Sequence, residues 1–352
     1  MKILHVINTM EIGGAQRLIA DLLPILAQNI GDKVSLLIFK TMDKNGLTDQ
    51  LKESRVQIIS TNTDKNYSLK TVLPLWRAVK QYDIVHFHCT PALYTAALLP
   101  FFHKAKFIYT EHSTSSRLRQ YRWMKPIEKW VYNRMDKIIS ISAEAETALR
   151  EWIGLNNRDK FVVIPNGINI SNFINECKTP KRNLIMVSRF VPAKDQKTVI
   201  ESLQYVEDSF LKLIFVGDGE TMEECKNLAM KMSLSDRVDF LGSRSNIPEL
   251  LSESYIGIQS SNWEGFGLTA VEIMASGKPV IASDVEGLRQ VVEGAGLIFE
   301  RGNARALAKN INALLSDDFY YNCVAEKCKL RAQKYDIRKT AFAYIDVYKS
   351  LL

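Results

Sequence analysis

The feature that most constrains the fold of this chain is the alternation of short β-branched runs with helical runs. Five strand-like runs occupy residues 1–7, 33–38, 83–88, 106–110 and 137–141. Residues 15–29 and 69–81, which lie between such runs, show the apolar spacing of helices. This alternation predicts a doubly wound parallel sheet, and the nearly continuous apolar strands fit a sheet covered on both faces.

A second series of the same kind follows in the other half of the chain. Six more strand-like runs occupy residues 183–188, 211–216, 238–241, 256–258, 279–282 and 296–299. Residues 164–180 between the two series are rich in turn-forming and polar residues, and we expect the domain joint there. From Ala304 onward the pattern predicts helices without a strand. Two such halves facing each other would form a cleft, with ligands at the carboxyl ends of the strands.

Length and composition exclude several classes of protein. The chain has 352 residues, enough for two domains, and lacks any run of 18 uncharged apolar residues that could span a membrane. The opening apolar run is broken at Asn8, too early for a secretory signal. The odd number of scattered cysteines favours reduced thiols and a cytoplasmic location: Cys89, Cys177, Cys225, Cys323 and Cys328.

The positive charge is concentrated in one segment, residues 101–134. It holds eight bases and two acids, a net +6 of the +7 carried by the whole chain. Residues 117–134 also contain several aromatic side chains, a composition that suits an anionic membrane surface. No nucleic-acid motif accompanies the segment, so we expect no nucleic-acid partner. The alternative is a solvated helix whose Trp130 and Val131 face the core.

The strongest local motif is a glycine loop between a strand and a short helix. Gly265 and Gly267 would let the backbone approach a ligand closely. The helix that follows offers unpaired N–H groups and the positive end of its dipole, which suits a phosphate. Gly277 would end that helix in a left-handed cap. A glycine loop alone is equally consistent with an ordinary strand–turn–helix.

Two acids add information to this loop. Glu264 precedes the helix, and Glu272 lies within it between Val271 and Ile273. A carboxylate in such an apolar helix needs hydrogen-bond donors, because burying it without a partner is costly. The two hydroxyls of a ribose would supply them.

The pattern Glu-x7-Glu from Glu264 to Glu272, with Gly-Phe-Gly-Leu inside it, resembles the signature of glycosyltransferase family 4. Further elements resemble motifs of this family in the expected order, so that the resemblance covers essentially the whole chain. They are the glycine loop at 8–16, the Thr-x-His element at 109–113, the inter-domain element at 164–168, the Arg…Lys element at 187–194 and the glycine turn at 216–219. Several ordered motifs are far more specific than any one of them.

This resemblance implies an α/β protein with the GT-B fold, in which two Rossmann-like, doubly wound parallel-sheet domains face a cleft. Residues 1–168 would form the domain on the acceptor side, and residues 180–335 the domain that binds the nucleotide sugar. A C-terminal helix at about 336–352 would pack back on the first domain.

The resemblance also assigns roles to residues. His112 and Glu264 would be catalytic, with His112 near the sugar and the acceptor and Glu264 against the donor sugar, while Glu272 would hold the ribose. The residues expected to bind the donor are Gly13, Gly14, Arg189, Lys194, Gly217, Gly265, Phe266, Gly267, Leu268 and Glu272. His86 and His88 alternate along one strand without an evident third metal ligand, and we interpret them as strand-end residues.

Two positions depart from the family pattern. Ser188 stands where the family usually has a glycine before the arginine, and Asp195 where it has a glycine after the lysine. Asp195 is expected to cap a helix that begins near Gln196, but it brings a negative charge near Lys194. The role of Lys194 is therefore less secure than that of Arg189.

The implied reaction is retaining transfer of a sugar, from a UDP- or GDP-linked donor to a glycan or lipid-linked acceptor, in the synthesis of bacterial surface polysaccharide or glycoconjugates. The resemblance implies no cofactor and no metal. We expect a cytoplasmic enzyme, with possible peripheral membrane contact through residues 101–134. The alternatives are a sugar-nucleotide epimerase of the same fold and a non-catalytic protein that binds nucleotide sugars.

Overall fold

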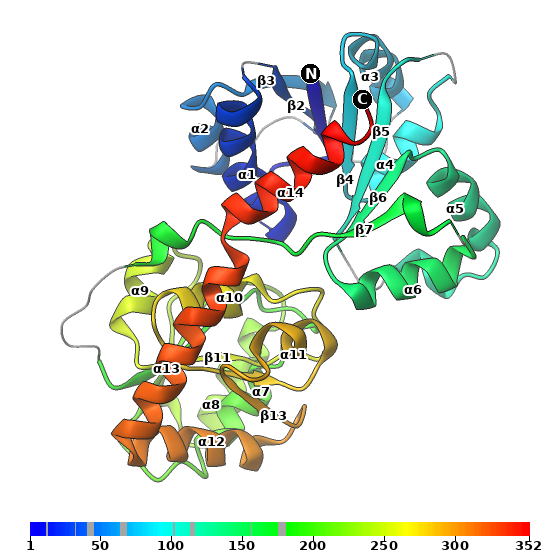
Figure 1. The fold of residues 1–352 in the computed structure, drawn as a ribbon. Coiled ribbons are helices and arrows are strands. Elements are labelled where there is room, and N and C mark those ends of the chain that lie inside the picture. The colour runs from blue at the N-terminus through cyan, green and yellow to red at the C-terminus, as the bar shows by residue number, and fades with distance from the viewer. Residues whose placement is uncertain are drawn as a thin grey trace. The chain divides into compact units, whose positions relative to one another are not determined.

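The structure is a computed structural model of the chain. It describes residues 1–11, 13–31, 33–40, 46–63, 69–100, 103–112, 117–155, 157–174 and 181–352. The chain forms two compact units (Figure 1). Unit 1 combines Met1–Gly167 with Ile337–Leu352, and unit 2 is Ile168–Asp336.

The core of unit 1 is a seven-stranded parallel sheet in the order β3-β2-β1-β4-β5-β6-β7. Its strands are β1 (Ile3–Ile7), β2 (Val34–Lys40), β3 (Gln57–Thr63), β4 (Ile84–His88), β5 (Lys106–Glu111), β6 (Lys137–Ser140) and β7 (Phe161–Val163). The chain moves outward from β1 in one direction and from β4 in the other. The strand order therefore reverses between β1 and β4, which is where sheets of this type bind ligands.

The helices of unit 1 cover both faces of this sheet, as the apolar strands predict. They are α1 (Gly14–Ile30), α2 (Gly46–Lys52), α3 (Val72–Val79), α4 (Thr90–Ala97), α5 (Met124–Asn133), α6 (Ala143–Ile153) and α14 (Ile337–Lys349). On one face, α14 lies beside α1 although more than 300 residues separate them in the chain (Figure 1). Tyr344 and Tyr348 of α14 are fully buried there.

Unit 2 is built on a six-stranded parallel sheet in the order β10-β9-β8-β11-β12-β13. Its strands are β8 (Asn183–Val187), β9 (Lys212–Val216), β10 (Val238–Phe240), β11 (Ile256–Gln259), β12 (Val280–Ser283) and β13 (Leu297–Phe299). Its helices are α7 (Gln196–Ser202), α8 (Met222–Lys231), α9 (Ile247–Glu253), α10 (Leu268–Ala275), α11 (Glu286–Val292), α12 (Ala304–Ser316) and α13 (Asp318–Ala332). The strand order reverses between β8 and β11.

The predicted fold class, with two doubly wound parallel sheets, is confirmed. The sequence analysis missed two edge strands, β3 and β7. β3 ends in the polar residues Ser60 to Thr63, and β7 has only three residues, so neither produces a clear strand pattern. None of the described helices is both long enough and apolar enough to cross a membrane. Four cysteines have free thiols, and Cys177 lies outside the described residues.

Candidate functional site

In unit 2, two loops meet at the point where the strand order reverses. One follows β8 and leads to α7, and the other follows β11 and leads to α10. The N–H of Asp195 donates to the carbonyl of Ser260 (3.1 Å), and the N–H of Asn262 donates to the carbonyl of Ala193 (2.8 Å). Lys194 and Ser261 form an isolated antiparallel bridge between these bonds. The backbone thus fastens the predicted Arg…Lys element to the predicted glycine loop.

Lys194 and Glu264 form an ion pair across these two loops. The Lys194 ammonium donates to one carboxylate oxygen of Glu264 and lies 3.3 Å from the hydroxyl of Ser261. The other carboxylate oxygen accepts from the N–H of Gly265 (3.2 Å). Both side chains are about four-fifths buried, with exposed fractions of 18% and 20%. A cation and an acid are therefore held side by side at the end of the central strands.

The helix α10 begins directly after the glycine loop with an open N-terminus. Its N-cap, Gly267, is left-handed (φ 87°, ψ 48°) and has no side chain with which to cap the helix. The first turn carries no acid, so the N–H groups beginning at Leu268 and the positive end of the dipole are available to an anion. The side chain of Phe266 packs against Tyr335 in the core, so Phe266 can reach a ligand only through its backbone.

Glu272 lies about one helical turn, roughly 6 Å, beyond the start of α10. Its neighbours Val271 and Ile273 are buried, whereas Glu272 itself is half-buried. The side chain therefore lies on the border between the core and the surface. This position allows the carboxylate to meet a polar ligand that rests at the start of the helix.

Arg189 lies on the same side of the sheet, just after β8. Its side chain is exposed, and its carbonyl accepts from the amide of Gln196 (3.0 Å). Within the described part of the chain, the guanidinium of Arg189 takes part in no hydrogen bond or ion pair. It is a cation without an internal partner, next to the loops that hold Lys194.

The predicted helix cap at Asp195 is confirmed. Its carboxylate accepts from the N–H of Thr198 (3.3 Å) at the start of α7 and from the hydroxyl of Ser260 (3.1 Å). The negative charge that departs from the family pattern is thus engaged by hydrogen-bond donors. This leaves Lys194 paired with Glu264 rather than with Asp195.

Gly217 has a structural reason to be glycine. It lies after β9 with φ 135°, and a Cβ there would come within 2.0 Å of the carbonyl oxygen of Ser188. The missing side chain lets the turn after β9 approach the backbone that precedes Arg189. Gly217 therefore allows the close packing of this turn against the loop that carries Arg189.

In unit 1, the predicted residues follow β1 and β5. Gly13 is the N-cap of α1 in an extended conformation, and Gly14 is the first residue of the helix. Gly13 has no side chain with which to cap α1, and the first turn has no acid, so the positive end of the helix dipole is not neutralised by an acid there. The side-chain oxygen of Gln16 would lie 2.5 Å from a Cβ at Gly13. Ile12, the residue before this loop glycine, lies outside the described residues. His112 directly follows β5.

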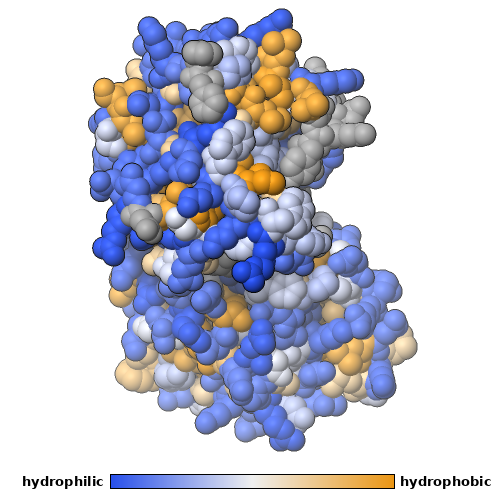
Figure 2. All heavy atoms as spheres, turned by 90° about the vertical axis from the view of Figure 1, so that its right-hand side faces the viewer, coloured by the Kyte–Doolittle hydropathy of each residue, from blue (hydrophilic) through white to orange (hydrophobic). Residues whose placement is uncertain are grey.

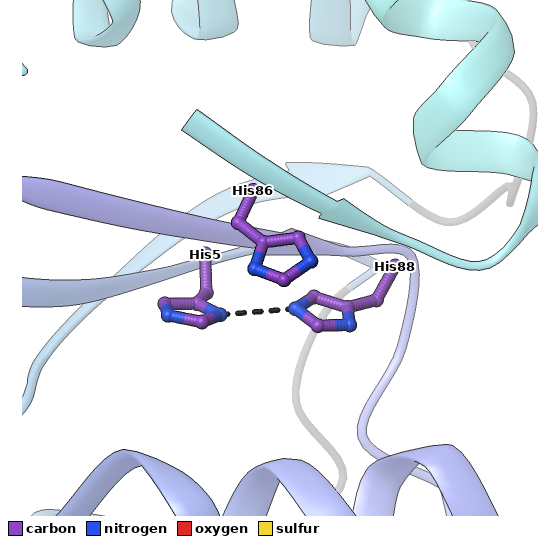
Figure 3. Close-up of side chains that lie close together, drawn as sticks. All are labelled: His5, His86 and His88. Atoms are coloured by element: carbon purple, nitrogen blue, oxygen red, sulfur yellow. Dashed lines mark hydrogen bonds between the residues drawn. The ribbon is translucent and has the colours of Figure 1, made fainter. Parts of the chain in front are cut away.

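His112 belongs to a cluster of four histidines. His5 from β1, His86 and His88 from β4, and His112 are joined or stacked with one another (Figure 3 shows the first three). Ring nitrogens of His5, His86 and His88 lie within 4.8 Å of one another. The sequence showed no third metal ligand for His86 and His88, but β1 pairs with β4 and places His5 directly opposite His86.

Burial keeps these rings neutral. It lowers the pKa of His5 to about 3 and that of His112 to about 4. Burial also lowers the pKa of His86 and of His88 well below the usual value, and the neighbouring imidazoles add to the effect. None of the four carries a positive charge at neutral pH.

The basic segment is split between structural and exposed residues. Arg119 forms a buried ion pair with Glu111, and Arg134 donates to the carbonyls of Ala97 and Leu99. Bases and large apolar side chains remain exposed along and just before α5. They are Tyr121, Arg122, Trp123, Lys125, Ile127, Lys129 and Trp130, which we call the α5 patch.

In the alternative of a solvated helix, Trp130 and Val131 both face the core. Val131 does so, but Trp130 is 48% exposed, because Val131 and Glu128 occupy the buried side of α5. Figure 2 faces the side of the molecule on which α5 lies in Figure 1, and hydrophobic residues stand among hydrophilic ones on that surface. The side chain of Arg117 and residues 101–102 and 113–116 lie outside the described part of the segment.

Two protein-family models match this chain, one in each half. The family model for Glycosyltransferase Family 4 matches residues 12–172, and the model for Glycosyl transferases group 1 matches residues 168–335. Together the two models match residues 12–335.

Among curated relatives, an uncharacterized glycosyltransferase from Methanocaldococcus jannaschii is 31% identical over 63% of this chain and 62% of its own length. The Escherichia coli UDP-Gal:alpha-D-GlcNAc-diphosphoundecaprenol alpha-1,3-galactosyltransferase is 27% identical over 94% of this chain and 91% of its own length. The alignment to the first of these spans less than two thirds of that relative.

A solved structure of Anabaena HepE in complex with UDP and glucose superposes with a TM-score of 0.86. It is 22% identical and covers 99% of this chain and 100% of that one. Sucrose-phosphate synthase from Thermosynechococcus elongatus gives a TM-score of 0.82 at 21% identity, with 100% and 99% of the two chains covered. These likenesses show that the fold is that of the GT-B glycosyltransferases.

Proposed function

The chain belongs to glycosyltransferase family 4, and we propose that it transfers a sugar, with retention, from a nucleoside-diphosphate sugar to a glycan or lipid-linked acceptor. The synthesis of bacterial surface polysaccharide or glycoconjugates is the setting we propose. The observation that carries this proposal is the Lys194–Glu264 pair beside the open N-terminus of α10, where the strand order of unit 2 reverses.

The diphosphate of the donor would rest on the N-terminus of α10. Negative charge grows on this leaving group while the bond from the anomeric carbon to its oxygen breaks. Arg189, Lys194 and the N–H groups from Gly267 and Leu268 would stabilise that charge. Lys194 and the start of α10 are held in place by the fold before the donor arrives, whereas the guanidinium of Arg189 is exposed. We propose that Gly13 and Gly14 of α1 bind the same donor.

Glu272 would accept hydrogen bonds from the ribose hydroxyls, one turn along the helix that binds the phosphate. Glu264 would contact the hydroxyls of the donor sugar, since it immediately precedes the glycine loop. We propose that unit 1 supplies His112 to the transferred sugar and to the acceptor. The backbone turn at Gly217 would support the loop that carries Arg189 and Lys194.

Retention is best explained by a same-face substitution. The bond between the anomeric carbon and the diphosphate oxygen breaks, and the acceptor oxygen bonds to the same face of the sugar. The proton of the acceptor hydroxyl goes to the leaving diphosphate, which acts as the base. No carboxylate nucleophile is needed, in keeping with the pairing of Glu264 to Lys194.

The relatives support the choice of donor and acceptor. The Escherichia coli and Campylobacter jejuni relatives are named as transferases that act on diphospho-undecaprenol-linked sugars. Solved structures of the similar Anabaena protein hold UDP or UDP-glucose. We therefore propose a UDP-linked donor and a lipid-linked acceptor. An epimerase would convert the donor without an acceptor, so a product that contains the acceptor separates the two functions.

Replacing Glu272 with alanine is expected to abolish UDP binding. UDP at about 100 times its Kd should stabilise the wild type by about 2.7 kcal/mol, which raises the Tm of a unit of this size by about 5–10 °C. The variant loses most of this shift because the ribose loses its acceptor. Glu201→Ala, a half-buried glutamate near the far end of α7, is the matched control and keeps the shift. An unchanged shift in Glu272→Ala would remove the ribose role.

We also propose that the α5 patch docks unit 1 on an anionic membrane, where a lipid-linked acceptor resides. Trp123 is 65% exposed, Ile127 41% and Trp130 48%, next to bases that have no buried partner in the fold we describe. Aromatic side chains insert at the level of the headgroups while the bases attract anionic lipid. Residues of both kinds are exposed along α5 and the turn before it.

Vesicle co-sedimentation tests this docking. Each base near an anionic surface contributes about 1 kcal/mol, so replacing Arg122, Lys125 and Lys129 with serine is expected to weaken binding to phosphatidylglycerol vesicles by about 100-fold. The matched control replaces three lysines of unit 2, Lys212, Lys226 and Lys231, with serine, and it is expected to bind the vesicles like the wild type. Equal binding of both variants, or equal binding to phosphatidylcholine vesicles, contradicts the proposal.

A further inference from the structure

We propose that His5, His86, His88 and Tyr348 are positioning residues that fix His112 in the tautomer with its proton on Nδ1, so that His112 donates a hydrogen bond to an oxygen of the sugar substrate. This inference rests on the proposed function, because it assumes that His112 faces the substrate. It assigns no proton abstraction to His112, consistent with a leaving phosphate that acts as the base.

Three of the histidines form a line of imidazole hydrogen bonds. His5 Nδ1 lies 2.9 Å from His88 Nε2, and His88 Nδ1 lies 3.2 Å from His112 Nε2. The rings of His5 and His88 have centroids 5.2 Å apart and planes only 12° apart, so they lie edge to edge, nearly in one plane (Figure 3). This is the arrangement that an N–H···N bond requires.

The line continues into the C-terminal helix. His5 Nε2 lies 3.4 Å from the hydroxyl of Tyr348, which is 2.7 Å from His86 Nδ1. His86 Nε2 is 2.7 Å from the hydroxyl of Thr110, and that hydroxyl is 3.1 Å from the hydroxyl of Tyr344. All of these groups are buried in unit 1. A continuous chain therefore runs from Tyr344 to His112.

The spacing favours hydrogen bonds over a metal ion. Two imidazole nitrogens on one tetrahedral zinc lie roughly 3.3 Å apart, since each is about 2.0 Å from the metal. The nitrogens of His5 and His88 are closer than that, at 2.9 Å. Both nitrogens of His86 are already bonded to Tyr348 and Thr110.

A neutral imidazole has one donor and one acceptor nitrogen, so the direction of one bond in the chain sets the direction of the next. One possible direction is that every bond of the chain is donated from the Tyr344 side toward His112. In that case the buried hydroxyl of Tyr344 donates to Thr110, and at the other end His88 Nδ1 donates to His112 Nε2. His112 then carries its proton on Nδ1. In the reverse direction the hydroxyl hydrogen of Tyr344, or that of Thr110 if Thr110 accepts from both His86 and Tyr344, would need a further acceptor, and the described residues provide none.

The hydrogen-bond chain ends at His112 Nδ1. His112 Nδ1 is buried and has no hydrogen-bond partner among the described residues. With the chain pointing toward His112, a substrate oxygen that accepts from Nδ1 satisfies every donor in the chain. With the opposite direction, one buried hydroxyl donor, that of Tyr344 or that of Thr110, would stay unpaired even with substrate bound, which is costly.

The ¹⁵N spectrum of the histidine rings in the full-length protein tests this directly. At pH 7 we expect His5, His88 and His112 each to show a protonated Nδ1 and a bare Nε2, assigned through single His→Gln variants. A protonated Nε2 in His112 of the wild type overturns the proposal. This readout needs neither donor nor acceptor, so it can fail independently of the proposed function.

Tyr348→Phe tests the coupling. Loss of the hydroxyl between His86 and His5 is expected to change the ring-nitrogen shifts of His112 and to lower kcat about tenfold, with the Kd for UDP unchanged because the proposed ribose and diphosphate contacts of unit 2 are untouched. Tyr344→Phe, which removes the terminal donor, should shift His112 in the same sense. Tyr109→Phe, a buried tyrosine on the opposite face of β5, is the matched control. Unchanged His112 shifts in both chain variants contradict the coupling.

Discussion

Lys194→Ala is expected to lower kcat/KM for sugar transfer by about 10²–10³-fold, the usual loss when one fixed donor to a developing negative charge is removed. The ammonium is four-fifths buried between Ser261 and Glu264, so water cannot replace it well. The loss has two parts: the leaving phosphate loses a cation, and Glu264 is left as an unpaired negative charge beside it. Release of the nucleotide from a panel of UDP- and GDP-sugars measures the effect.

The control for this variant is Lys197→Ala. Lys197 lies three residues further on, on α7, where it is exposed and pairs with the exposed Glu224. Its removal should change kcat/KM by less than twofold. The double variant Lys194→Ala with Glu264→Gln separates the two parts of the loss, because it removes the unpaired charge. If Lys194→Ala behaves like Lys197→Ala, the phosphate lies elsewhere and the donor-site assignment is wrong.

Unit 1 is expected to lose stability steeply as the pH falls from about 6.5 to about 4. The unfolded chain protonates its histidines near pH 6.5, whereas burial lowers the pKa of His112 to about 4 and that of His5 to about 3 in the native state. Between these values the unfolded state binds more protons, so stability is present above pH 6.5 and is lost below it. Each buried histidine contributes about 1.4 kcal/mol per pH unit.

Urea unfolding at several pH values, followed by tryptophan fluorescence, measures this effect. Four of the five tryptophans, Trp76, Trp123, Trp130 and Trp152, lie in unit 1, so the signal reports mainly on that unit. His5→Gln should flatten the dependence on pH. His103→Gln, at a half-buried ring outside the cluster whose pKa burial also lowers, should flatten it less than His5→Gln does. A stability that does not change between pH 7 and pH 5 would show that the four rings are not buried as neutral groups.

The fold class could be predicted from the sequence because the alternation of strand-like and helical apolar patterns can be seen within short segments. The cap at Asp195 was predictable for the same reason, since it joins residues three apart. The partnership of Lys194 with Glu264 was not predictable from the pattern alone, because they lie 70 residues apart. The Lys194–Glu264 contact depends on β8 and β11 being neighbours in the sheet. The order of strands cannot be predicted from the sequence of any single segment.

The histidine cluster shows the same limit more clearly. His86 and His88 were visible as an alternating pair, but His5 joins them only because β1 and β4 are adjacent in the sheet. The two tyrosines that complete the chain come from a helix more than 230 residues away from Thr110. Had the pairing of β1 with β4 been assumed from the doubly wound topology, all three histidines could have been placed together.

The return of α14 to unit 1 has a consequence for how the protein is made. Ile337, Ala341, Tyr344, Ile345 and Tyr348 fill the core beneath α1, and they are translated after all of unit 2. The nascent N-terminal half therefore leaves the ribosome with an uncovered apolar face, and its histidines still lack the hydroxyls of Tyr344 and Tyr348. Its hydrophobic core is complete only after α14 has been translated. A truncated or stalled chain therefore exposes an apolar surface that chaperones and proteases can recognise.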